Sequence, residues 1–230
     1  MKLNRLSDRI WVYPYEEERD RPNLSYIRGD HFSIAVDAGH SDAHTAEFYR
    51  ALGEAGLPLP KVTAVTHWHW DHTLGMHAVH GLTVACTRTN EHLKQFRQSL
   101  SQPGGRERHL ALHESIRREY AGGKPIITAE ADIVFSGELL LDAGNCPVHL
   151  IGTDAPHTDD SVLVFAESEG VLFIGDAACD TVPDGVKDPM LAGRLADTIR
   201  GLNAGICLEG HWAPLSAEET IRDLLEQDIG

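Results

Sequence analysis

The sequence predicts an α+β fold, and three observations lead to this prediction. Short apolar runs bounded by turn residues fill the first third of the chain and return in its second half, a pattern typical of strands. The stretches between them, near residues 41–57 and 89–121, carry apolar side chains close to helical spacing. The chain has 230 residues and no visible repeat, low-complexity segment or linker. We therefore expect one domain spanning 1–230.

The first half of the chain is predicted to contain a strand meander, a helix and two further strands. The helix covers residues 41–57, with Ser41 as its N-cap and Gly56 at its end. Its apolar face is expected to contain Ala46, Tyr49, Leu52 and Gly53. The expected strands lie at 9–15, 24–30, 31–39, 61–66 and 82–87.

A helical insert is predicted at about 89–121, between two strands. Leu93, Phe96 and Leu100 indicate its first helix, the segment 102–105 (QPGG) is a break, and 106–120 continues as a second helix. The insert is expected either to form an outer packing layer or to act as a wall or lid over a functional site.

The second half returns to strands and closes with helices. Ser216 followed by Glu219 forms a capping box at the start of the last helix. The expected strands lie at 132–137, 138–144, 146–154, 161–168, 170–177 and 206–210, and the expected helices at 189–205 and 216–227.

The bulk properties exclude several classes of partner. The formal net charge is −15 and no basic groove is visible, so a nucleic-acid partner is not expected. The start, MKLNRLSDRI, has no apolar run, and no stretch is long enough to span a bilayer, so no membrane association is expected. The four cysteines are scattered, which fits a reduced, cytoplasmic protein. We expect a small-molecule substrate, and the oligomeric state is left open.

The most informative segment is 66–72, THWHWDH, directly after an apolar strand. It places three imidazoles and one carboxylate within six residues, and these groups are the ligands that zinc and related divalent ions prefer. His67 and His69 can point the same way because side chains two residues apart share a face in an extended chain. Asp71 and His72 lie further along the loop and could serve a second ion.

Three more candidate ligands lie just past the ends of predicted strands. His157 follows the strand at 146–154, Asp176 ends the strand at 170–177, and His211 follows the strand at 206–210. Loops at strand ends gather at one edge of a sheet, so we expect these side chains to meet the THWHWDH loop there. A surface loop that is merely rich in histidine would not explain these separate placements.

The motifs THWHWDHT, APHTDDS, FIGDA and EGHW, in this order along nearly the whole chain, resemble those of the metallo-β-lactamase-fold hydrolases. The DAG at 37–39 is similar to the Asp-x-Gly signature of that family. The resemblance implies a four-layer αββα sandwich of two mixed β-sheets, with helices on the outer faces and the metal site at one sheet edge.

The resemblance also assigns roles to residues of this chain. It implies that His67, His69 and His157 hold one ion, that Asp71, His72 and His211 hold a second, and that Asp176 bridges the two. Asp37 would order the metal loop, and Thr66 at the start of that loop is grouped with it as a supporting residue. Asp71 would also be catalytic, by orienting the nucleophile. The donors favour zinc, and iron or manganese would also fit.

The implied activity is that of a dinuclear, metal-dependent hydrolase. Two cations roughly 3.5–4 Å apart can share a bridging hydroxide at neutral pH, because they lower the pKa of water from about 15.7 towards 7. The substrate would be a small ester, thioester, lactone or phosphoester. The ligand set looks most like glyoxalase II, the acyl-homoserine lactonases and the phosphodiesterase members, and the chain is set apart from true β-lactamases, which usually lack the bridging Asp.

Two differences between this chain and those family members bear on which branch of the family it resembles. Residues 156–161, PHTDDS, lack the further glycine seen before the serine in many of those members. Only 19 residues follow His211, so a C-terminal substrate-binding region like that of glyoxalase II is not expected. The alternative function is a non-heme iron redox enzyme on the same fold, similar to the persulfide dioxygenases. A non-catalytic sensing role is a further alternative, against which the full ligand set argues.

Residues that contact the substrate are predicted from their position near the site. His40 follows the DAG turn and Lys187 lies in a segment, 180–190, that is expected to cover part of the mouth. Trp68 and Trp70 are expected to pack and fix the loop shape. Cys179 and Cys207 are expected in the core. His109 and His113 are explained equally well by an ordinary helix surface.

Overall fold

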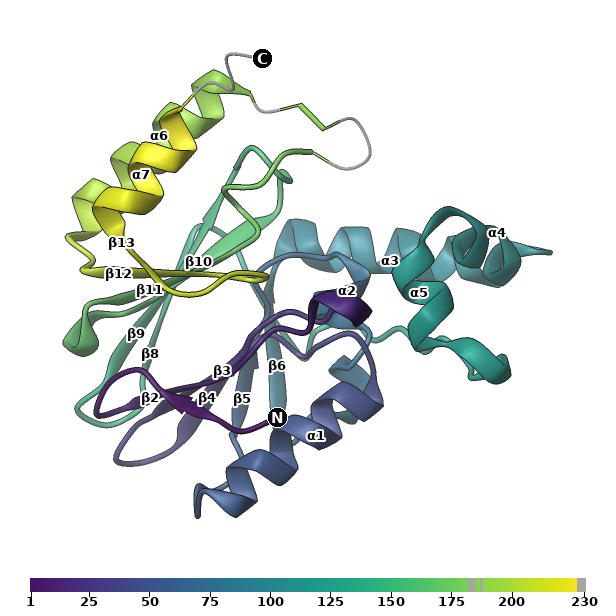
Figure 1. Ribbon diagram of the computed structural model, residues 1–230, viewed down its shortest axis with the longest axis horizontal. Coiled ribbons are helices and arrows are strands. Elements are labelled where there is room, and N and C mark those ends of the chain that lie inside the picture. Colours follow the sequence, from purple (N-terminus) through teal and green to yellow (C-terminus); the bar gives the residue numbers. More distant parts are fainter. Residues whose placement is uncertain (182–184, 187, 227–230) are drawn as a thin grey trace.

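The computed structural model describes residues 1–181, 185–186 and 188–226, and within them two mixed sheets are packed face to face (Figure 1). The first sheet has the order β1-β2-β3-β4-β5-β6-β7, antiparallel up to β4 and parallel from there. Its strands are β1 (Asn4–Arg5), β2 (Ile10–Tyr13), β3 (Leu24–Arg28), β4 (Ser33–Val36), β5 (Val62–Ala64), β6 (Leu82–Cys86) and β7 (Ile133–Phe135).

The second sheet has the order β13-β12-β11-β10-β9-β8, antiparallel except for the parallel pair β11 and β12. Its strands are β8 (Glu138–Asp142), β9 (Pro147–Thr153), β10 (Ser161–Ala166), β11 (Val171–Gly175), β12 (Ile206–Glu209) and β13 (Leu215–Ser216). Strand β10 is buried on both faces, as its continuous apolar sequence indicates. Val162 and Val164 point into the core between the sheets, whereas Leu163 and Phe165 pack under the outer helices.

Helices cover both outer faces of the sandwich (Figure 1). The helices α6 (Pro189–Leu202) and α7 (Ala217–Leu225) pack on the second sheet through residues such as Leu195, Ile199 and Leu224. The helix α1 (Asp42–Glu54) packs on the first sheet through Phe48 and Leu52. The predicted α+β, four-layer sandwich is therefore confirmed.

Two predicted helix caps are present. The Ser41 Oγ accepts a hydrogen bond of 3.2 Å from the His44 backbone N–H at the start of α1. The capping box of Ser216 and Glu219 starts α7. The face predicted for α1 is half right: Leu52 is buried and Tyr49 packs against the same cluster, but Ala46 and Gly53 are exposed. The polar His44 and Thr45 are buried in their place.

The insert contains three α-helices where the sequence predicted two. They are α3 (Thr87–Ser101), α4 (Gly105–Leu112) and α5 (Glu114–Glu119). The second predicted helix is broken because His113 adopts an extended backbone, with φ −119° and ψ 105°. The three helices lie together to one side of the sheets (Figure 1).

The edge of the sandwich that carries the candidate ligands is tied together by backbone hydrogen bonds. The Val162 N–H donates to the Thr66 carbonyl at 2.7 Å, and the Asn23 N–H donates to the Gly210 carbonyl at 2.6 Å. Each of these bonds joins a segment of one sheet to a segment of the other. This edge is thus a fixed framework for the loops that follow β4, β5, β11 and β12. Across the described part of the chain, no helix combines the length and apolar character needed to cross a membrane.

Candidate metal centre

The loop after β5 turns the THWHWDH segment into an extended stretch followed by the single-turn helix α2 (Trp70–Thr73). The Thr73 hydroxyl holds this turn by donating to the carbonyls of Trp68 at 3.0 Å and His69 at 2.9 Å. The buried Trp70 donates its Nε1–H to the Ser115 Oγ at 3.1 Å. The prediction that Trp70 fixes the loop shape by packing is confirmed.

Three imidazoles form a first cluster at the sheet edge. The His67 Nε2 lies 3.2 Å and the His157 Nε2 lies 2.9 Å from the His69 Nδ1. The outer nitrogens of two rings have their own partners, because His67 Nδ1 lies 3.2 Å from the Thr66 Oγ1 and His157 Nδ1 lies 2.7 Å from the Asp180 carbonyl. A carbonyl can only accept, so the His157 Nδ1 carries the proton and its Nε2 presents a lone pair to the cluster.

Two carboxylates and two imidazoles form a second cluster beside the first. The Asp71 Oδ2 lies 2.9 Å from the His211 Nε2 and 3.3 Å from the His72 Nε2. Together with Asp176, one ligand atom of each of these residues lies within 4.8 Å of every other. His72 is completely buried, and His211 is partly exposed.

Asp176 connects the clusters. Its Oδ2 lies 3.5 Å from the Nε2 atoms of both His72 and His211 and 3.8 Å from the Nε2 of His157. The structure therefore brings together all seven residues for which a ligand role was predicted, with Asp176 in the position between the two groups.

The two clusters shift histidine pKa values in opposite directions. Burial lowers the pKa of His69 to about 4, and burial together with the neighbouring histidines lowers the pKa of His67 well below its usual value. Burial acts in the same direction on His72, but the carboxylates of Asp71, Asp176 and Asp37 outweigh it and raise its pKa. His67 and His69 thus favour the neutral imidazole with a free lone pair, which is the form that binds a metal.

A cation fits the donors present. Among the described residues, the buried His72 Nε2 and Asp176 Oδ1 have no hydrogen-bond partner, although such atoms are normally satisfied. The three nitrogens of the first cluster face one another at distances that one cation between them would satisfy. Imidazole and carboxylate donors without a thiolate suit zinc, iron or manganese.

Asp37 and Thr66 orient the candidate ligands through hydrogen bonds. The Asp37 Oδ1 accepts the Thr66 N–H at 2.8 Å, and its Oδ2 accepts the His72 Nδ1–H at 2.8 Å. The Thr66 hydroxyl also contacts the carboxylate, at 2.9 and 3.0 Å. With its Nδ1 proton held in this way, His72 turns its Nε2 towards Asp71 and Asp176.

Gly210 is required by the close packing around the second cluster. A Cβ at this position would lie 2.2 Å from the Asp176 Oδ1 and 2.8 Å from the His72 Cε1. Because real Cβ atoms do not approach so closely, a side chain here would displace both residues. The EGHW motif therefore places a glycine directly before His211 for a steric reason.

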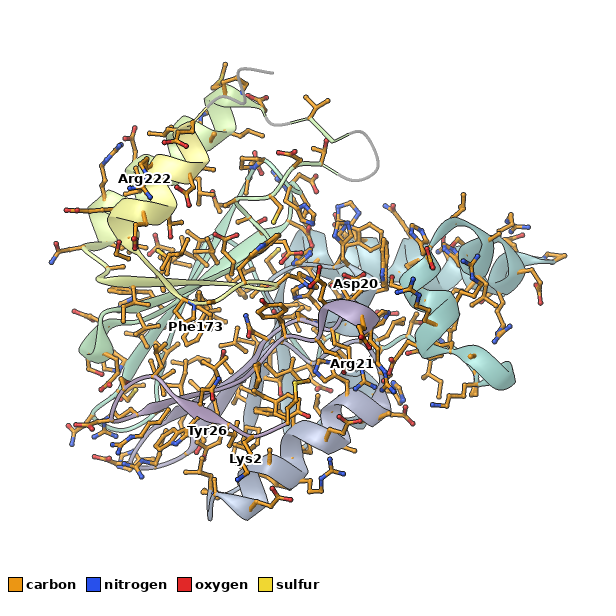
Figure 2. The ribbon with its side chains drawn as sticks, in the orientation of Figure 1. Lys2, Asp20, Arg21, Tyr26, Phe173 and Arg222 are labelled. Atoms are coloured by element: carbon orange, nitrogen blue, oxygen red, sulfur yellow. The ribbon has the colours of Figure 1, made fainter. Side chains whose placement is uncertain are left out.

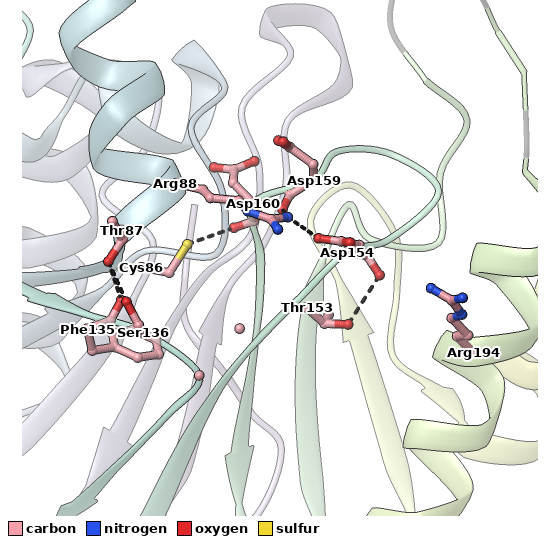
Figure 3. A pocket seen from close by; sticks show the side chains of 12 residues that line it. Cys86, Thr87, Arg88, Phe135, Ser136, Thr153, Asp154, Asp159, Asp160 and Arg194 are labelled. Carbon is pink, nitrogen blue, oxygen red and sulfur yellow. Dashed lines mark hydrogen bonds and ion pairs between the residues drawn. The ribbon is translucent and has the colours of Figure 1, made fainter.

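The turn that carries His157 is anchored to the start of α3 (Figure 3). The Asp160 carbonyl accepts from the Thr89 hydroxyl at 3.2 Å and from the Cys86 thiol at 3.4 Å, and the Arg88 Nη1 donates to the Asp159 carbonyl at 2.6 Å. A cavity of about 480 Å³ lies on this side of the turn. Arg88 in this cavity pairs with Asp154, and none of the seven candidate ligands lines it, so we place the reaction elsewhere.

The candidate reaction site is a cavity of about 380 Å³ over the two clusters. His69, Asp71, His157, Asp176 and His211 line its floor. Its described walls consist of Tyr15, Glu17, Asp20, Trp70, Cys179, Asp180 and Trp212. No described residue of the helical insert lines this cavity. Instead Ile116, Tyr120 and Phe96 pack behind Trp70, so the structure favours a packing layer over a lid.

Several expectations for individual side chains are corrected. His40 is fully buried, with its Nδ1 3.1 Å from the Asp20 carbonyl, so it cannot touch a substrate in the cavity. Lys187 lies outside the described residues. Cys179 lines the cavity and is not in the core, whereas Cys207 is buried as predicted. His113 contacts Trp70, with ring centroids 4.0 Å apart and the rings tilted by 41°, and is therefore more than a surface residue.

The sequence did not indicate Tyr15, Glu17 and Asp20 as site residues. They precede β3, more than 40 residues before the metal loop, and no motif surrounds them. Trp212 could have been found, since it follows the candidate ligand His211 directly in the EGHW motif.

Comparisons with known proteins agree with this geometry. The family model of the metallo-beta-lactamase superfamily matches residues 18–210. Among solved structures, a metallo-beta-lactamase from Pontibacter korlensis has a TM-score of 0.70 at 17% identity, covering 98% of this chain and 99% of that chain. A metallo-beta-lactamase family protein from Thermus thermophilus has a TM-score of 0.65 at 19% identity, covering 96% of this chain and 79% of that chain.

The structural similarity extends beyond proteins named as β-lactamases. A double mutant of the sec-alkyl sulfatase PisA1 has a TM-score of 0.67 at 15% identity, covering 97% of this chain and 40% of that chain. No curated protein sequence matches the chain. These identities are low enough that the solved structures establish the fold alone, and the match over residues 18–210 establishes the family. The chain belongs to the metallo-beta-lactamase superfamily.

Proposed function

We propose that this protein is a hydrolase that uses two divalent metal ions to cleave a small-molecule ester, thioester, lactone or phosphoester. The observation that carries the proposal is the convergence of two donor clusters on Asp176, in the floor of a cavity. A structural metal site is normally closed by protein ligands, whereas this site opens onto space for a substrate.

His67, His69 and His157 would hold one ion, and Asp71, His72 and His211 the other, with Asp176 between them. When bound, such ions lower the pKa of a water molecule towards neutrality and polarise a carbonyl or phosphoryl oxygen. Zinc fits the donors, and iron or manganese would fit as well. No serine or cysteine nucleophile is needed for this chemistry.

The side chains of this protein would position the reactants. Asp71 lines the cavity, its Oδ2 is hydrogen-bonded to the His211 Nε2 at 2.9 Å, and the His72 Nε2 lies 3.3 Å from the same oxygen. A carboxylate fixed in this way can accept a hydrogen bond from the attacking water and keep it directed at the substrate. Burial would raise the pKa of Asp71, but His72 and His211 outweigh this effect and lower it, so the carboxylate stays ionised and able to accept.

A hydrolysis panel on zinc-loaded and manganese-loaded protein tests the proposal. The panel contains an aryl ester, a thioester, a lactone, a phosphodiester and a phosphomonoester. Asp71→Ala is the inactive variant, and Asp197→Ala, at an 80% exposed side chain on α6, is the matched control. We expect one class to turn over with wild type and control and to fall at least about 100-fold in Asp71→Ala.

Two results would contradict the proposal. One is that Asp71→Ala hydrolyses every substrate class that turns over at the same rate as wild type. The other is the absence of turnover while metal analysis finds two ions bound per chain. In the second case, a coloured, iron-rich protein that consumes oxygen would support the redox alternative.

A further inference from the structure

The walls of the candidate reaction cavity combine aromatic rings with carboxylates. Tyr15, Trp70 and Trp212 line it, together with Glu17, Asp20 and Asp180. These three carboxylates lie outside the two metal-ligating clusters. Asp20 is positioned where the strand ends meet the helical insert (Figure 2). Asp176, only 7% exposed and with its Oδ1 unpartnered among the described residues, belongs to the same cavity.

Among the described residues that line the cavity there is no lysine or arginine. Neighbouring Arg21 is only 1% exposed, and its guanidinium contacts Glu119 at 2.6 Å and Glu47 at 3.3 Å. Arg19 lies 3.3 Å from Glu16. Among the described residues, no Lys or Arg forms an ion pair with Glu17, Asp20 or Asp180. The His211 Nδ1 lies 3.8 Å from the Asp20 Oδ1 and offsets part of its charge, so the rim keeps the negative charge of Glu17 and Asp180.

Aromatic rings and carboxylates together recognise organic cations. A positively charged nitrogen is attracted to the face of a tryptophan or tyrosine and to a nearby carboxylate, while its alkyl groups pack on the rings. Trp212 is 51% exposed, so it has free surface for such a contact. The chain as a whole carries a formal net charge of −15, which attracts cations and repels carboxylates and phosphates.

We propose that the reaction cavity selects a substrate that carries an ammonium or alkylammonium group at its non-reacting end, held by Tyr15, Trp70 and Trp212 and by the carboxylates of Glu17, Asp20 and Asp180. The inference deepens the proposed function and rests on it for the role of the cavity floor. The bond to be cleaved faces the two metal-ligating clusters, and the cation lies at the rim. Substrates with a carboxylate or phosphate at that end are disfavoured.

A pair of isosteric probes isolates the contribution of the charge. Choline and 3,3-dimethyl-1-butanol have nearly the same shape and the same hydroxyl group, and only choline is charged. Their affinities for zinc-loaded protein are measured by calorimetry at matched ionic strength. We expect choline to bind about tenfold more tightly, as cation–π and carboxylate contacts at a partly exposed site allow.

Variants identify the residues responsible. The double variant Glu17→Gln and Asp20→Asn is expected to weaken choline at least about fivefold and to leave the neutral alcohol unchanged. Trp212→Leu is expected to weaken choline more than the alcohol. Asp197→Asn, which removes the same charge from the exposed face of α6, is the matched control and is expected to change neither affinity.

The outcomes separate this inference from the hydrolase proposal. Equal affinity of the two probes, no detectable binding of either, or a preference that survives the double variant overturns the inference. Hydrolysis of neutral panel substrates without any preference for choline overturns the inference alone. A preference for choline without turnover of any panel substrate overturns the hydrolase proposal and supports the cation site.

Discussion

Replacing Asp37 with asparagine tests whether this buried carboxylate sets the proton position on His72. Asp37 accepts hydrogen bonds from the Thr66 N–H and the His72 Nδ1–H, both at 2.8 Å, on its two different oxygens. An asparagine has one oxygen and one NH2 group, so it can accept from only one of these donors. Its backbone is not a concern, because Asp37 has φ 64° and asparagine tolerates the left-handed region about as well as aspartate.

The expected loss follows from this geometry. If the amide NH2 faces His72, the ring must present a lone pair at Nδ1 and carry its proton on Nε2, the atom that faces Asp71 and Asp176. If it faces Thr66, a buried N–H loses its acceptor, which costs about 1–3 kcal/mol of folding stability. Changes to residues that orient a ligating histidine typically weaken metal binding about 10–100-fold. We expect a loss in this range at the second cluster.

The assay is a titration of metal-free protein with Zn²⁺ in the presence of a competing chelator, with urea unfolding of the same samples. Asp132→Asn is the matched control, because the Asp132 Oδ2 alone accepts both the N–H and the hydroxyl of Thr83, each at 2.8 Å. The amide oxygen of asparagine can replace it there, so metal affinity should stay unchanged. Wild-type zinc affinity and stability in Asp37→Asn would refute the reasoning about His72.

Three further predictions concern packing, buried charge and metal removal. Gly210→Ala should lower metal content and activity sharply, because the new Cβ would lie 2.2 Å from the Asp176 Oδ1. The control is Gly205→Ala, whose Cβ would meet no atom closer than 3.7 Å and which should bind as much metal as wild type. Glu119→Gln should destabilise the protein by about 3 kcal/mol in urea unfolding, because it leaves the buried Arg21 with only its partly exposed partners Glu16 and Glu47. The control is Glu114→Gln, at an exposed carboxylate, which should cost less than about 0.5 kcal/mol. Burial would raise the pKa of Glu119, but Arg21 and Ser41 outweigh this effect and lower it below its unfolded value. This stabilisation is therefore present at pH values above the ordinary carboxyl pKa and lost as the pH falls through the pKa of Glu119 in the folded protein. If the free energy of unfolding of Glu119→Gln fell at acidic pH in the same way as that of wild type, this reasoning would be contradicted. Removing metal with a chelator should lower the melting temperature by about 5–10 °C, since ligand at 100-fold over its Kd contributes about 2.7 kcal/mol, and identical melting curves with and without chelator would rule out tight binding.

The sequence by itself determined the helix caps, the candidate ligands and all described strands except the two-residue β1 and β13. These features depend on neighbouring residues, since a strand follows from a local apolar run and a cap from a serine at a helix start. The ligands could be predicted for the same reason, as the THWHWDH loop, Asp176 and His211 each follow a strand end directly. Asp37 was predicted through its motif, and the structure adds the bonds to Thr66 and His72.

Only the tertiary structure decided which surfaces meet. The buried face of α1 includes Leu52 as predicted but also the polar His44, because the segment packs against the crowded sheet edge, where His44 and His40 are completely buried. The helical insert packs behind Trp70, away from the cavity walls, because Ile116, Tyr120 and Phe96 find their apolar partners there. Tyr15, Glu17 and Asp20 reach the cavity from a distant part of the chain. Contacts of this kind arise from the packing of whole layers, and no local pattern of residues encodes them.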